Sequence, residues 1–172
     1  LSSIFVLGLL VGSFLNVVIY RYPIMLQKQW KNECQDYLAN ESDPLTNLNT
    51  AEIGNETGKD EVLFNLIYPR SSCPNCQHKI TALENIPVLS WLFLRGKCSS
   101  CKTNISIRYP LVELSTACLS LLLAWRFGYG LEVLCLLGLL WSLICLSLID
   151  FDTQFLPDDI TLPLLWAGLL CS

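Results

Sequence analysis

Residues 73–76 read Cys-Pro-Asn-Cys, and residues 98–101 read Cys-Ser-Ser-Cys. The spacing within each pair lets both sulfur atoms reach one metal ion at about 2.3 Å. The 21 residues between the pairs form a loop that returns the second pair to the first. Two disulfides or free thiols are the alternative interpretation. We expect one Zn²⁺ in a structural site, because four sulfur ligands fill all tetrahedral positions of the ion. These ligands are Cys73, Cys76, Cys98 and Cys101.

His78 follows the first pair by two residues and is an alternative ligand. A site of four thiolates needs no such ligand, so we expect His78 at the surface.

The composition around these cysteines is that of a membrane protein. The chain has 172 residues, of which 52% are hydrophobic, a fraction too high for an ordinary soluble domain. Ten of the eleven Lys and Arg residues lie between Arg21 and Arg108. Most of the other cysteines among the nine fall in apolar runs, so the pattern does not resemble a secreted disulfide framework. We therefore expect a reducing compartment for the polar segment.

The apolar runs predict a mainly α, polytopic membrane protein, since about 20 apolar residues are enough to cross a bilayer. Gly8 and Gly12 would let another helix approach the first span closely. Residues 40–60 are rich in Asn, Glu, Asp, Thr and Gly and predict a mobile loop. The predicted segments are a first transmembrane helix at 1–20, a zinc-binding insert at 21–110, a second transmembrane helix at 111–126, a third at 131–150, an acidic loop at 151–159 and the start of a fourth helix at 160–172.

Basic residues at the ends of the spans predict the orientation. Arg21 and Lys28 follow the first span, and Lys102 and Arg108 precede the second. Positive charge near membrane ends is typical of the cytosolic side. The zinc-binding insert and the acidic loop are therefore expected in the cytosol, and residues 126–130 on the outer face.

Asp150 directly follows an apolar run, so its carboxylate is expected at the membrane boundary. A carboxylate there is either functional or simply the polar end of a helix. Aspartyl proteolysis needs two carboxylates that share a proton. Asp152 and Asp159 are expected on the solvated loop, so a partner for Asp150 is expected from another helix.

Six stretches in the same order resemble the type IV prepilin leader peptidase family, and together they cover nearly the whole chain. They are Gly12-Ser-Phe-Leu-Asn-Val-Val-Ile-Tyr-Arg, Cys73-Pro-Asn-Cys, Glu84-Asn-Ile-Pro, Gly96-Lys-Cys-Ser-Ser-Cys, Arg108-Tyr-Pro-Leu-Val-Glu-Leu and Leu148-Ile-Asp with Leu156-Pro-Asp.

The resemblance implies a bifunctional enzyme of the bacterial inner membrane. It would cleave the leader peptides of type IV prepilins and type II secretion pseudopilins at the cytosolic face. It would then methylate the new N-terminal amine with S-adenosylmethionine, for which the sequence indicates no binding site. Its partners would be these substrates and the lipid bilayer, and no nucleic acid.

The resemblance also implies that Asp150 is the first catalytic aspartate. The second belongs to a Gly-x-Gly-Asp motif on a later helix, whereas here Leu131 follows Gly128-Tyr-Gly130. We therefore expect an N-terminal fragment that lacks the second aspartate and is inactive alone. The roles of Asp158 and Glu113 stay open.

Two other classes of function remain at this point. One is a membrane assembly or scaffold protein whose zinc knuckle binds a cytosolic partner, which leaves residues 150–158 without a role. The other is a transporter with Asp150 in an ion path, which predicts charges deeper in the spans than the sequence has.

Overall fold

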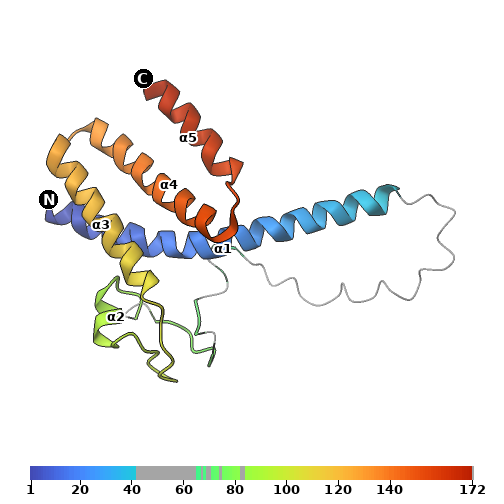
Figure 1. The fold of residues 1–172 in the computed structure, drawn as a ribbon, viewed down its shortest axis with the longest axis horizontal. Helices are drawn as coiled ribbons and strands as arrows, with labels where there is room; N and C mark the ends of the chain where they lie inside the picture. Colours follow the sequence, from blue (N-terminus) through green and yellow to red (C-terminus); the bar gives the residue numbers. More distant parts are fainter. Residues whose placement is uncertain (42–64, 67, 69–70, 74, 82–83, 172) are drawn as a thin grey trace. The chain divides into compact units, whose positions relative to one another are not determined.

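The computed structural model describes residues 1–41, 65–66, 68, 71–73, 75–81 and 84–171. The loop predicted at residues 40–60 lies outside this part from residue 42 onward. The chain divides into two compact units, Leu1–Tyr20 with Arg70–Ser172, and Arg21–Pro69. The helices are α1 (Ser2–Glu41), α2 (Leu89–Phe93), α3 (Arg108–Phe127), α4 (Leu131–Thr153) and α5 (Asp158–Cys171) (Figure 1).

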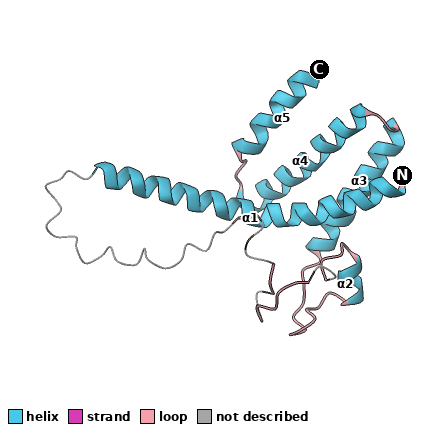
Figure 2. Ribbon diagram, turned by 180° about the vertical axis from the view of Figure 1, so that it is seen from behind, coloured by secondary structure: helices cyan, strands magenta, loops and turns pink. Residues whose placement is uncertain are grey.

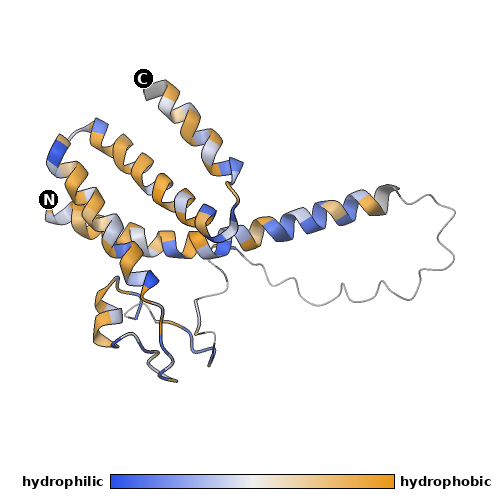
Figure 3. Ribbon diagram, viewed as in Figure 1, coloured by the Kyte–Doolittle hydropathy of each residue, from blue (hydrophilic) through white to orange (hydrophobic). Residues whose placement is uncertain are grey.

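Three helices in the described part are long and apolar enough to cross a membrane. They are the segment Ser2–Leu38 of α1 and the whole of α3 and α4. Apolar residues dominate α4 along most of its length (Figure 3). The mainly helical fold and the polar insert between the first two long helices are confirmed. The predicted start of a fourth span corresponds to α5, whose 14 residues begin at Asp158.

α1 continues beyond the apolar run, which ends at residue 20, to Glu41. The continuation contains Met, Leu, Gln and Lys, which have high helix propensity. Pro23 lies inside the helix and removes one backbone donor there. Within this second unit, Arg21 Nη1 donates a 3.0 Å hydrogen bond to the carbonyl oxygen of Asn65.

The N-terminal half of α1 approaches α3 closely at two glycines. A Cβ atom added at Gly8 would lie 2.7 Å from the Cα of Ala117, and one added at Gly12 would lie 2.7 Å from the Cα of Glu113. Real Cβ atoms are not found at such distances from backbone atoms, so only glycine fits at either position. The small-residue pair in the sequence is therefore the contact between the two helices.

α3 and α4 form an antiparallel hairpin and lie side by side (Figures 1 and 2). Gly128 ends α3 with a φ of +79°, a conformation that favours glycine. Ala124, Val133 and Leu137 are buried together next to this turn. Further along the hairpin, Trp141 Nε1 donates a 3.0 Å hydrogen bond to Ser120 Oγ. The two helices are thus held by both apolar packing and a polar contact.

The insert between α1 and α3 consists mainly of turns. Its described part contains α2 and two isolated antiparallel bridges, Ser72 with Lys79 and Lys97 with Asn104. Figure 2 shows helices and loops but no strand in the described residues. The described part of the insert thus has little regular structure of its own.

Candidate metal centre and aspartate site

The two cysteine pairs lie in turns of the same construction. In the first, Cys73 N donates to His78 O at 3.0 Å and Gln77 N to Cys73 O at 2.9 Å. In the second, Cys98 N donates to Thr103 O at 2.8 Å and Lys102 N to Cys98 O at 3.1 Å. The residue after the second cysteine has a positive φ in both turns, +56° at Gln77 and +59° at Lys102. Each pair is thus one knuckle closed by a β-bridge.

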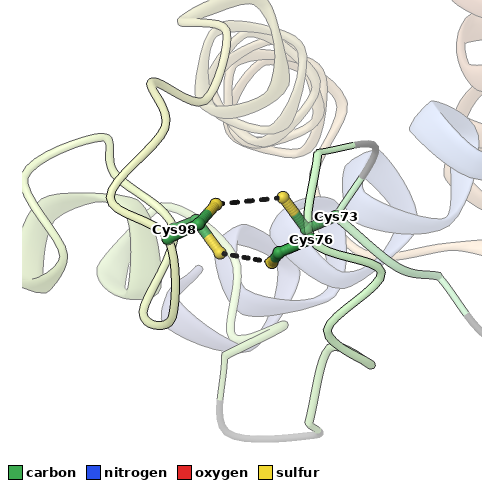
Figure 4. Close-up of side chains that lie close together, drawn as sticks. Cys73, Cys76 and Cys98 are labelled. Atoms are coloured by element: carbon green, nitrogen blue, oxygen red, sulfur yellow. Dashed lines mark hydrogen bonds between the residues drawn. The ribbon is translucent and has the colours of Figure 1, made fainter.

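The knuckles bring four sulfur atoms together. The ligand atoms of all four cysteines lie within 4.8 Å of one another. The Sγ atoms of Cys73 and Cys101 are 3.7 Å apart. Those of Cys76 and Cys98 are 3.9 Å apart (Figure 4). Sulfur atoms at about 2.3 Å from a tetrahedral zinc are about 3.8 Å from each other. The cluster therefore has the dimensions of a metal site, and none of its cysteines is in a disulfide.

Thr103 supports the sulfur cluster from the second knuckle. Its hydroxyl lies 3.1 Å from Cys101 Sγ and accepts a 2.9 Å hydrogen bond from Asn75 Nδ2 of the first knuckle. Hydrogen bonds from its hydroxyl and backbone lower the pKa of the Cys101 thiol to about 5. This favours the thiolate, which is the form that binds metals.

Glu84 connects the two knuckles through hydrogen bonds that sequence reasoning did not assign. Its carboxylate accepts from the Ser99 hydroxyl and, at 2.9 Å each, from the backbone and hydroxyl of Thr81. These donors lower the pKa of Glu84 to about 2. His78 Nε2 is buried and lies 3.5 Å from the same carboxylate. His78 thus faces Glu84 and is not part of the sulfur cluster.

A buried carboxylate attaches the insert to α3. Glu113 is only 8% exposed, and its Oε2 accepts a 2.7 Å hydrogen bond from Val88 N. Ser13 of α1 hydrogen-bonds to the same side chain. Val88 has a φ of +58°, which is rare and strained for a β-branched residue. Glu113 thus receives hydrogen bonds from both α1 and the insert.

Asp150 lies exposed in the last turn of α4. Among the described residues, its carboxylate has no hydrogen bond or ion pair. α4 continues to Thr153, and Gln154 ends it in the left-handed conformation. Asp152 is therefore in the helix and not on the predicted solvated loop, because the helix continues beyond the apolar run.

Asp152 forms an ion pair with Arg108 at the first residue of α3. The guanidinium donates two hydrogen bonds to the carboxylate, at 2.8 Å and 2.6 Å. This two-point contact joins the start of α3 to the end of α4. Asp152 is thus engaged in a structural contact, whereas the Asp150 carboxylate has no such contact within the described part of the chain.

Asp158 and Asp159 form the first turn of α5, where carboxylates complement the helix dipole. Pro157, just before them, is fully buried. The four cysteines predicted as ligands lie together in the structure, whereas the catalytic role of Asp150 stays a prediction. Sequence reasoning missed the contacts of Arg108 and Glu84. Both residues begin stretches that resemble the prepilin leader peptidase family, and this position was the one indication in the sequence that they are important.

Comparison with known proteins decides the family. The model of the bacterial peptidase A24 N-terminal domain matches residues 6–127, which is more than half of the chain. The chain belongs to this peptidase family. The model of the type IV leader peptidase family matches residues 137–172 as well. Both parts of the leader peptidase pattern are therefore present in their expected order.

Curated relatives of this peptidase family cover the chain almost completely. A "prepilin leader peptidase/N-methyltransferase" of Pseudomonas putida is 53% identical over 97% of this chain and 52% of its own length. Proteins of the same name from Aeromonas hydrophila and Neisseria gonorrhoeae are each 50% identical, over 98% and 96% of this chain and 53% of their own lengths. The chain thus spans about half the length of these relatives. No solved structure matches it.

Proposed function

We propose that this chain is part of a bifunctional membrane enzyme. The enzyme cleaves the leader peptide from type IV prepilins and type II secretion pseudopilins, and it N-methylates the new terminal residue. Membership of the type IV leader peptidase family and the names of the relatives support this proposal. Because the chain spans about half of these relatives, the activity is assigned to the whole protein, and this part alone is expected to be inactive.

The carboxylate of Asp150 carries the proteolytic part of the proposal. It is exposed at the end of a helix that can cross a membrane, and it is free among the described residues. In aspartyl proteolysis one carboxylate activates water while the other donates a proton to the scissile amide. We assign one of these two roles to Asp150 and expect its partner aspartate in the other half of the protein. Two adjacent carboxylates would raise one pKa, so one of them keeps a proton near neutrality.

The four cysteines are assigned to a structural Zn²⁺. The sulfur spacings of 3.7 Å and 3.9 Å support a tetrahedral ion, and four sulfur ligands leave no position for water or substrate. The ion would hold the two knuckles together, and Glu84 and Thr103 would fix their relative positions. S-adenosylmethionine would supply the methyl group, and no residue of this chain is assigned to it.

We place the protein in the bacterial inner membrane with the knuckles in the cytosol. Basic residues at the inner ends of the spans support this orientation. A membrane-impermeant thiol reagent should then fail to label Cys34 in intact cells. Strong labelling of Cys34 from outside would reverse the orientation.

The decisive experiment measures prepilin cleavage by full-length variants. Asp150→Asn preserves size but removes the titrating group, so cleavage should fall by about three orders of magnitude or more. Asp159→Asn is the control and should retain most of the activity. Normal cleavage by Asp150→Asn would refute the catalytic assignment.

The metal is tested separately on purified full-length protein. Elemental analysis should give about one zinc per chain. Cys73→Ser should lower the zinc content and loosen the insert, because metal binding supplies much of the folding energy of such a module. Freshly reduced protein that contains two disulfides and no metal would contradict the zinc assignment.

A further inference from the structure

The short helix α2 exposes the apolar side chains that a soluble module would bury. Leu89 is 51% exposed, Leu92 63% and Phe93 83%. No residue of α2 is buried. Unlike these three side chains, Trp91 points into the module, where its ring packs against Gly96. A cluster of large apolar side chains on one short segment is typical of an interaction surface.

α2 is held next to the part of α3 where the membrane span begins. Val88 precedes α2 directly and is hydrogen-bonded to Glu113 in the second turn of α3. Exposed apolar residues of α3 lie next to Glu113 in the sequence, with Leu111 60% and Leu114 47% exposed. Figure 1 shows α2 beside this end of α3. The exposed apolar side chains of α2 are therefore held close to the end of α3 where its own exposed apolar residues begin.

The charges next to α2 are those of a membrane interface. Residues 86–97 contain two basic residues, Arg95 and Lys97, and no acidic one. Both basic residues are exposed and directly follow α2. Apolar side chains followed by Lys and Arg are typical of segments that lie in the plane of a bilayer surface, where the cations meet anionic headgroups.

We propose that α2 is an interfacial membrane anchor. Leu92 and Phe93 insert among the lipid chains of the bilayer that α3 enters, and Arg95 and Lys97 contact anionic headgroups. The bilayer covers this surface, and no second protein is needed. The anchor and Glu113 together fix the depth of the cysteine module at the membrane. This inference requires only that α3 spans the membrane, so it does not depend on the proposed catalysis.

Photocrosslinking in vesicles tests the anchor. Full-length protein carrying p-benzoylphenylalanine in place of Phe93 is reconstituted in vesicles of phosphatidylethanolamine and phosphatidylglycerol. The matched control carries the same group in place of Ser100, an exposed residue between Cys98 and Cys101. Lipid adducts at position 93 should exceed those at position 100 about tenfold, as expected for an apolar group that partitions into lipid. Phosphatidylglycerol should be enriched among the adducts, and Arg95→Gln with Lys97→Gln should remove that enrichment.

The same experiment separates the other possible occupants. Equal lipid yields at positions 93 and 100 would overturn the proposal, because α2 would then be no closer to lipid than the knuckle. Crosslinks from position 93 to a polypeptide, including a second copy of the chain, would overturn it in favour of a protein interface. Cleavage of prepilin by unlabelled protein is measured in the same vesicles, so loss of the enzyme function is recognised separately from loss of the anchor.

Discussion

Gly12→Ala tests the packing of α1 on α3 with a single methyl group. The added Cβ would lie 2.7 Å from the Cα of Glu113 and 3.3 Å from its carbonyl oxygen. Both neighbours are backbone atoms, so rotation of a side chain cannot relieve the contact. The two helices must move apart by several tenths of an ångström, and Glu113, which holds Val88, must move with its helix.

The magnitude follows from two opposing terms. Overpacking a close contact costs about 1–3 kcal/mol. Alanine is a better helix former than glycine by about 1 kcal/mol, which offsets part of this cost. Gly138→Ala in α4 is the matched control, because a Cβ there meets nothing within 4 Å. The helix propensity term is similar for both variants, so their difference isolates the overpacking: Gly12→Ala should be about 1–3 kcal/mol less stable than Gly138→Ala.

The assay is equilibrium unfolding of the full-length protein in micelles, with the free energy of unfolding determined for both variants. Gly8→Ala should behave like Gly12→Ala, because its Cβ would lie 2.7 Å from the Cα of Ala117. If Gly12→Ala were as stable as Gly138→Ala, the two helices would not be in contact at Gly12, and the reasoning would be refuted.

Three further predictions concern the polar contacts. Glu113→Leu should destabilise the protein by about 1–3 kcal/mol, because it leaves the Val88 N–H without an acceptor, whereas Glu113→Gln keeps one and should cost less; equal losses in unfolding measurements would contradict this. A double-mutant cycle of Arg108→Gln and Asp152→Asn should give a coupling energy of about 0.2–1 kcal/mol, since the pair is partly exposed, and zero coupling would exclude the pair. The pKa of Glu84 is lowered from 4.5 to about 2, so its stabilising effect is fully present above pH 4.5 and is lost as the pH falls to 2. Urea titrations should therefore show that the difference in free energy of unfolding between the wild-type protein and Glu84→Gln becomes smaller as the pH falls from 4.5 to 2. A difference that stays constant would show that the ionised carboxylate does not stabilise the fold.

Local sequence patterns were enough to predict the mainly helical fold and the cysteine cluster, although not that α1 continues to Glu41. Two cysteine pairs with this internal spacing are typical of zinc knuckles, so Cys73 with Cys76 and Cys98 with Cys101 predict a metal site directly. The apolar runs of α3 and α4 likewise predict long helices, because about 20 residues are needed to cross a bilayer. Gly8 and Gly12 indicated a close contact, although the sequence did not identify α3 as the partner.

Only the tertiary structure decided which distant residues meet. Arg108 and Asp152 are 44 positions apart, and their pairing depends on how α3 and α4 pack and on α4 continuing to Thr153. The hydrogen bond from Val88 to Glu113 likewise joins the insert to a span across 25 positions. Such contacts depend on the relative placement of whole elements, which no local spacing encodes. The sequence by itself therefore determined the mainly helical class and the spacing of the four cysteines. Helix packing determined that Asp152 pairs with Arg108, whereas the Asp150 carboxylate has no partner among the described residues.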